Sequence, residues 1–152
     1  MKRIGFHYYP DTQHYQQSDF IHWLPTLENL GASWLVLQAP VSRALPEWFI
    51  QGLRIANIEP ILQFVMKPDQ LPPMGDLELL LRVYSRWGVK YVVLFNQPNS
   101  QHAWGGSAWA QSDLVERFLD IYHPLADMVL KYDLTPIFPP IQPGGDYWDT
   151  SF

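Results

Sequence analysis

Residues 87–99 read Trp-Gly-Val-Lys-Tyr-Val-Val-Leu-Phe-Asn-Gln-Pro-Asn, and this stretch decides the predicted fold. Its middle, Tyr91–Phe95, is a β-branched and aromatic run bounded by turn residues on both sides, which predicts a strand. Other strands are predicted at 3–8, 34–38, 60–65 and 134–138. Apolar residues at helical spacing predict helices between them, at 18–30, 46–55, 76–87 and 112–132.

The predicted order is therefore an α/β alternation of five strands and four helices. Continuous apolar strands alternating with helices are typical of a parallel sheet covered by helices. No linker divides residues 1–152, so we expect a single domain. Polar and aromatic residues follow the strands at their carboxyl ends, where parallel α/β folds carry their functional groups. These residues are His7, Tyr8, Gln38, Gln63, Asn96 and Gln97.

Composition excludes several classes of protein. The chain has 152 residues, of which 47% are apolar and 16% charged, so it is not a disordered tail. The absence of cysteine excludes disulfides and thiolate metal sites. A net charge of −5 gives no basic footprint for nucleic acid. The histidines do not have metal-ligand spacing and the Gly-Gly pairs lack a phosphate-loop pattern, so we expect neither a metal nor a cofactor.

No membrane partner is expected, because no run approaches the roughly 20 apolar residues of a spanning helix. Met1-Lys2-Arg3 is not followed by the apolar core that a signal peptide needs. If Met1 is the true start, we expect a soluble, cytoplasmic protein.

Asn96-Gln97-Pro98-Asn99, at the end of the fourth predicted strand, resembles a motif of the clan A glycoside hydrolases. Those enzymes are (β/α)8 barrels whose fourth strand ends in Asn-Glu-Pro. The resemblance implies a TIM-barrel-like fold, of which this chain is the N-terminal part, from the first to about the fifth strand. It implies a retaining O-glycosyl hydrolase ancestry, with Gln97 at the acid/base position and Asn96 contacting a sugar hydroxyl.

The same resemblance gives further side chains a carbohydrate-binding role. Three tryptophans in predicted loops are candidates for stacking on sugar rings: Trp104, Trp109 and Trp148. Gln38 and Gln63 either hydrogen-bond sugar hydroxyls or are structural polar groups of the sheet interior. His7 and Tyr8 either line the sugar site or close the end of the first strand.

Two departures from the family predict that this chain is not a competent hydrolase. Gln97 has the shape of glutamate but has no proton to transfer, and general acid/base assistance is worth about 10²–10⁴-fold in rate. The family's nucleophile is a glutamate on a seventh strand, which this chain does not reach. All five glutamates fall in predicted helices or at the amino end of a strand: Glu28, Glu47, Glu59, Glu78 and Glu116.

Two alternatives remain open at this point. The first is a carbohydrate-binding or scaffold protein of the same fold, in which Gln97 serves hydrogen bonding alone. The second is a complete flavodoxin-like α/β protein, which predicts a strand order other than sequential. In the partial-barrel interpretation the first and fifth strands have unpaired edges, so self-association is also expected.

Overall fold

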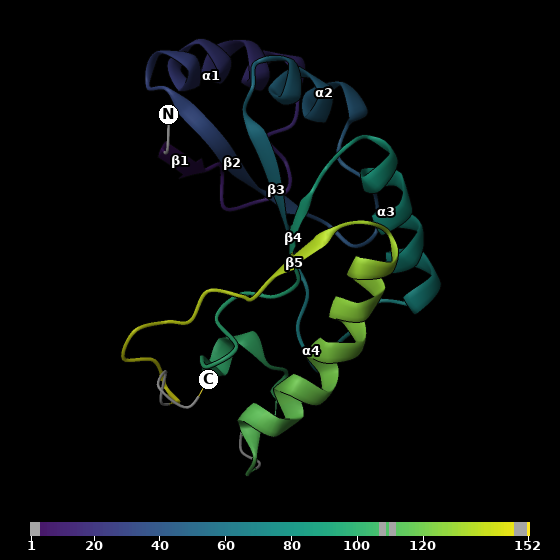
Figure 1. Ribbon diagram of the computed structural model, residues 1–152. Coiled ribbons are helices and arrows are strands. Elements are labelled where there is room, and N and C mark those ends of the chain that lie inside the picture. Colours follow the sequence, from purple (N-terminus) through teal and green to yellow (C-terminus); the bar gives the residue numbers. More distant parts are fainter. Residues whose placement is uncertain (1–3, 107–108, 110–111, 148–151) are drawn as a thin grey trace.

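The computed structural model describes residues 4–106, 109, 112–147 and 152. It is an α/β fold in which strands and helices alternate along the chain (Figure 1). The strands are β1 (Ile4–His7), β2 (Ala32–Ala39), β3 (Glu59–Phe64), β4 (Tyr91–Val93) and β5 (Thr135–Ile137). The helices are α1 (Gln17–Asn29), α2 (Glu47–Ile55), α3 (Met74–Arg86), the short η1 (Gln101–Ala103) and α4 (Leu114–Lys131).

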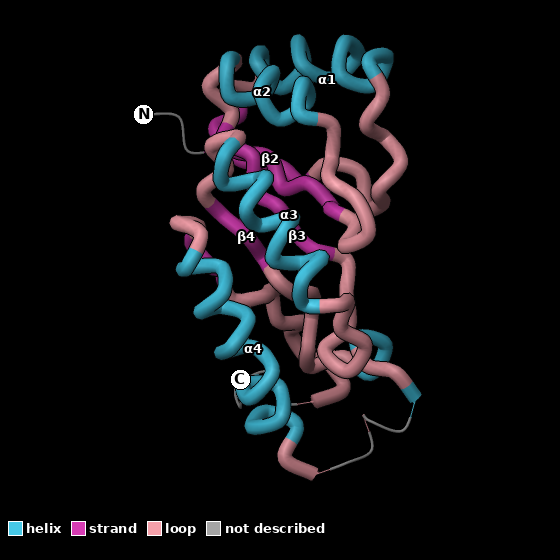
Figure 2. Tube along the Cα trace, turned by 90° about the vertical axis from the view of Figure 1, so that its right-hand side faces the viewer, coloured by secondary structure: helices cyan, strands magenta, loops and turns pink. Residues whose placement is uncertain are grey.

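All five strands are parallel, and they lie side by side in the order in which they occur in the sequence. The helices α1 to α4 follow one another along one side of this sheet (Figures 1 and 2). The flavodoxin-like alternative is wrong, because a doubly wound sheet has a non-sequential strand order and helices on both faces.

The face of the sheet toward the helices, here called the outer face, carries the core. Side chains alternate between faces along a strand, and Leu35 and Leu37 of β2 and Leu62 and Phe64 of β3 are no more than 1% exposed. From α2, Phe49 and neighbouring apolar residues pack into the same cluster. Fully burying each such side chain contributes about 1.5–3 kcal/mol.

The opposite face of the sheet, here called the inner face, has no described helix over it (Figure 1). Val36 and Val93 are buried by their neighbours on this face but do not belong to the core cluster. The ring of Trp34, in β2, lies over Gly5 of β1. A Cβ on Gly5 would stand 1.8 Å from the Trp34 ring, so the close approach of the two strands requires glycine there.

The sequence-based boundaries agree with the structure to within a few residues. The largest differences are of two residues, at the start of β2 (Ala32), the end of β4 (Val93) and the starts of α3 (Met74) and α4 (Leu114). Leu94 and Phe95 remain buried but leave the strand ladder. Gly88 follows α3 with φ 80°, the left-handed conformation in which helices commonly end.

Candidate functional site

The carboxyl ends of the strands gather most of the candidate side chains at one edge of the sheet. Gln38 of β2 pairs in register with Gln63 of β3, and Gln63 with Val93 of β4. Asn96 and Gln97 come three and four residues after the end of β4. This follows from the parallel topology, in which all strands end at the same side.

The two strand glutamines form a chain of hydrogen bonds. Gln38 Nε2 donates to Gln63 Oε1 at 2.7 Å, and Gln63 Nε2 donates to the Phe95 carbonyl oxygen at 3.3 Å. Gln63 is only 3% exposed, so its amide serves to orient Gln38. The side-chain oxygen of Gln38 accepts no hydrogen bond from the described residues and is therefore available to a ligand.

Gln97 lies in a strained turn. Its φ is 47°, a left-handed conformation that non-glycine residues rarely adopt. The turn is fixed by two backbone bonds, from Gln97 N to the Pro140 oxygen at 3.0 Å and from Ser100 N to the Gln97 oxygen at 2.9 Å. The Gln97 side chain is half-buried and that of Asn96 is exposed, and neither hydrogen-bonds to the described residues.

Asn99, the last residue of the motif, has a structural role. It is fully buried, with Nδ2 donating to the Gln142 oxygen at 2.8 Å and Oδ1 accepting from Gln142 N at 2.9 Å. Ser100 Oγ also bonds to the Gln142 side chain. These contacts join the loop after β4 to the segment after β5, which lie together in Figure 1.

Burial argues against a sugar-stacking role for Trp104. It is 3% exposed, its Nε1 donates to the Pro98 oxygen at 2.8 Å, and Arg117 lies 5.3 Å from its ring centre. Its ring therefore packs within the protein and contacts the motif loop at the Pro98 carbonyl group. Trp109 is half-buried and meets the Tyr147 ring edge-on. Trp148 lies outside the described residues.

An open hollow of about 380 Å³ lies at the ends of β2, β3 and β4. Its size is in the range of small-ligand pockets, about 300–1,000 Å³. Part of its lining is apolar, from residues such as Phe64 and Met66. The polar side chains in the lining are Gln38, Lys67, Gln70, Asn96 and His102. Sequence reasoning did not select Lys67, Gln70 or His102 as site residues, because none of them is the last residue of a strand or belongs to the motif.

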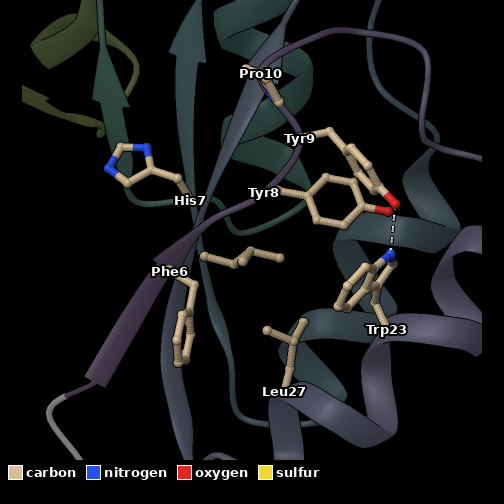
Figure 3. A pocket seen from close by; sticks show the side chains of 8 residues that line it. Phe6, His7, Tyr8, Tyr9, Pro10, Trp23 and Leu27 are labelled. Atoms are coloured by element: carbon tan, nitrogen blue, oxygen red, sulfur yellow. Dashed lines mark hydrogen bonds between the residues drawn. The ribbon is translucent and has the colours of Figure 1, made fainter.

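The side chains of His7 and Tyr8 point in opposite directions, although both residues border the hollow drawn in Figure 3. Figure 3 shows Tyr8 beside Tyr9 and Trp23, with His7 directed away from them. The Tyr8 hydroxyl donates to the His14 oxygen at 2.8 Å, and burial, with a smaller effect of Asp19, raises its pKa. Tyr8 therefore closes the end of β1 against α1 and α2. His7 is exposed on the inner face.

The hollow in Figure 3 is separate from the one at the ends of β2 to β4. It measures about 260 Å³, is lined mainly by apolar atoms from Phe6, Leu27 and their neighbours, and lies between β1 and α1. Trp23 Nε1 donates to the Tyr9 hydroxyl at 3.0 Å across it. It lies beside the free edge of β1, so it is part of the uncovered rim of the sheet.

Three described aspartates near the carboxyl ends of the strands are engaged in local hydrogen bonds. Asp69 accepts from Gly105 N at 2.7 Å, and Asp146 accepts from Gln101 N at 2.8 Å. A bond from Gln13 N and another from His14 lower the pKa of Asp11. A carboxyl group with a lowered pKa stays ionised and does not serve as a general acid.

The predicted positions of the glutamates are confirmed. All five are described, four lie in helices, and Glu59 is the first residue of β3, at the amino edge. Within the described part of the chain, no three His, Asp or Glu side chains group as metal ligands.

Comparisons with known proteins find no match among family models, curated proteins or solved structures. Among the described helices, none is both long and apolar enough to cross a membrane.

Proposed function

We propose that this chain is a glycoside hydrolase-like protein that binds a carbohydrate at the carboxyl edge of its sheet without hydrolysing it. One observation carries the proposal. The ends of β2, β3 and β4 carry four carboxamides, Gln38, Gln63, Asn96 and Gln97, and Gln97 stands where the glycosidase motif has its glutamate.

The topology supports a partial barrel as the underlying fold. A sequential order of parallel strands, with every helix on one side, is the arrangement that a (β/α)8 barrel repeats eight times. A parallel sheet with one open face is otherwise unusual, since such sheets are normally covered on both sides. In this interpretation the inner face of the sheet corresponds to the barrel interior.

Amide side chains suit binding and do not suit hydrolysis. A carboxamide has two donors and an acceptor, which match the mixed donor and acceptor character of a sugar hydroxyl. Glycoside hydrolysis by the retaining route needs two carboxyl groups about 5–5.5 Å apart. The described carboxylates of this edge are bound locally, and the five glutamates lie elsewhere.

The conformation of Gln97 supports a functional role for the motif turn. Holding a non-glycine residue in the left-handed region costs on the order of 1–3 kcal/mol, and such residues cluster at functional sites. Replacing Gln97 by glycine removes this cost together with the side chain. Gln97→Gly is therefore expected to be at least as stable as the natural chain and to bind carbohydrate less tightly.

A carbohydrate-binding screen with alanine variants tests the proposal. Soluble oligosaccharides are titrated calorimetrically into the natural chain and into Gln38→Ala and Asn96→Ala. Each variant is expected to bind about 2- to 10-fold more weakly, the usual effect of one net hydrogen bond. Gln17→Ala, on the exposed start of α1, is the control and should bind normally. Absence of binding to any oligosaccharide would contradict the proposal.

We also propose that the chain associates with a second copy of itself through the open side of the sheet. Within the described residues β1 and β5 each pair with another strand on one side alone, and the inner face carries apolar residues such as Ile61 and Ile137 that are only partly covered. Unpaired parallel edges favour pairing with another chain. Light scattering at several concentrations should show a dimer or larger species, and a monomer at every concentration would contradict this.

A further inference from the structure

Among the described residues, the lining of the hollow at the ends of β2 to β4 has a cationic side chain and no carboxylate. The cationic residue is Lys67, and the remaining polar residues of the described lining are three amides and His102. The chain as a whole carries a net charge of −5. Lys67 therefore gives this ligand-sized hollow a positive charge although the protein as a whole is acidic.

Lys67 forms no ion pair with any residue that the structure describes. Among the described residues its ammonium group makes one hydrogen bond, a long one from Nζ to the Trp104 oxygen at 3.4 Å. An ammonium group has three donors, so two remain for a ligand. By contrast, Lys90 and Lys131 each pair with a glutamate, at 3.3 and 2.7 Å.

The backbone around Lys67 holds it at the hollow. Its carbonyl oxygen accepts from Gln70 N at 3.1 Å, which closes a turn, and Val65 N bonds to the Ala39 oxygen at 2.9 Å. Asp69, the carboxylate nearest to Lys67 in sequence, accepts from Gly105 N instead. Lys67 and Asp69 thus contact the same peptide unit, at the Trp104 oxygen and at Gly105 N, without forming an ion pair with each other, and only Lys67 is in the lining of the hollow.

We propose that this hollow takes an acidic saccharide, a glycan whose units carry a carboxylate or sulfate group, with Lys67 contacting the anionic group. This inference rests on the proposed carbohydrate-binding function and names its ligand class. The free oxygen of Gln38 and the amide of Asn96 meet ring hydroxyls. The partly exposed apolar residues of the lining, Val41 and Met66, lie against the C–H face of the ring.

The expected energetics favour an acidic ligand over its neutral counterpart. A hydrogen bond to a charged group in a partly buried site contributes more than a neutral one, equivalent to about a 10- to 100-fold change in affinity. The interaction should also weaken with rising ionic strength, since an open hollow is screened by salt.

The test uses an array of neutral and acidic oligosaccharides, followed by calorimetry. The acidic probes are oligomers of galacturonic, mannuronic and glucuronic acid and sulfated oligosaccharides, and the matched neutral probes are the carboxyl-reduced forms of the uronates. The variants are Lys67→Met and the control Lys131→Met, which removes an equal charge on the distant helix α4.

Three results are distinguishable. Binding restricted to acidic probes, lowered about 10- to 100-fold by Lys67→Met and unchanged by Lys131→Met, supports the inference. The carboxylate and sulfate arms then identify which anion is preferred. Equal binding of neutral and acidic probes, unaffected by Lys67→Met, overturns the inference and leaves the proposed function intact. Binding to no probe overturns both.

Discussion

The two faces of the sheet differ although the same strands build both. Leu62 and Gln63 are neighbours in β3, yet Leu62 packs under the helices while Gln63 turns its amide to the inner face. The outer face is apolar and nearly inaccessible. The inner face mixes aliphatic residues with amides, and the amides lie toward the carboxyl ends of the strands.

This difference separates stability from function within one sheet. The outer face holds the large, fully buried side chains of the core, so it supplies most of the hydrophobic stabilisation. The inner face leaves polar groups accessible to a ligand and apolar groups accessible to a second copy of the chain. Substitutions on the outer face should therefore change folding, and those on the inner face should change binding.

The largest effect is expected from Leu62→Ala. Leu62 is fully buried in the outer core, and truncating such a leucine costs about 2–5 kcal/mol of unfolding free energy. The matched inner-face variant is Ile61→Ala. Ile61 is partly exposed, so its truncation leaves no closed cavity and should cost clearly less. Urea denaturation measures both, and equal losses would contradict the division between the faces.

An intermediate effect is expected from Tyr84→Phe on the outer side. The hydroxyl of Tyr84, in α3, accepts a hydrogen bond from Leu45 N at 2.8 Å in a fully buried place. Removing it leaves that N–H unpaired, which costs about 1–3 kcal/mol. Tyr122→Phe is the control, because the Tyr122 hydroxyl forms no hydrogen bond with the described residues.

The pH dependence of this loss sharpens the test. Burial raises the pKa of Tyr84 to about 12, so its hydroxyl stays protonated in the folded chain. A raised pKa gives stability that is fully present below the unfolded value, about 10 for tyrosine, and is lost as the pH rises further. The difference in unfolding free energy between Tyr84→Phe and Tyr122→Phe should thus be constant up to about pH 10. A difference that already changes near neutral pH would contradict the assignment.

The smallest effect on stability is expected from Gln63→Leu on the inner face. The substitution removes the acceptor for Gln38 and the donor to the Phe95 oxygen. Gln38 is partly exposed and can bond to water, and the lost bond to the Phe95 oxygen is long, at 3.3 Å, so the net loss should be about 1 kcal/mol, at the low end of the cost of an unpaired buried group. The free energy of carbohydrate binding should fall by more than the free energy of unfolding, because Gln63 no longer orients Gln38. Unchanged affinity would contradict a positioning role.

The sequence predicted the alternation of strands and helices because apolar periodicity and turn residues are local signals. The region around β4 shows the limit of this reasoning. Asn96 and Gln97 were recognised from their place after the strand, whereas the bonds from Asn99 to Gln142 depend on where a distant segment passes. The burial of Trp104 could not be predicted for the same reason, since a tryptophan in a loop is buried only if other parts of the chain cover it.

The contact between Gln38 and Gln63 could also not be predicted from the sequence. Each glutamine was a candidate on its own, but their contact depends on the register between β2 and β3. Lys67 could be placed after β3, yet nothing local indicated that it would have no carboxylate partner.

The most direct test of the account combines binding and turnover on one sample. The natural chain is incubated with aryl glycosides and with the oligosaccharide that it binds, and reducing ends are followed by NMR. We expect saturable binding that Gln38→Ala weakens, with no hydrolysis above background. Turnover that is abolished by changing Gln97 would contradict the central claim that this edge of the sheet binds a saccharide without cleaving it.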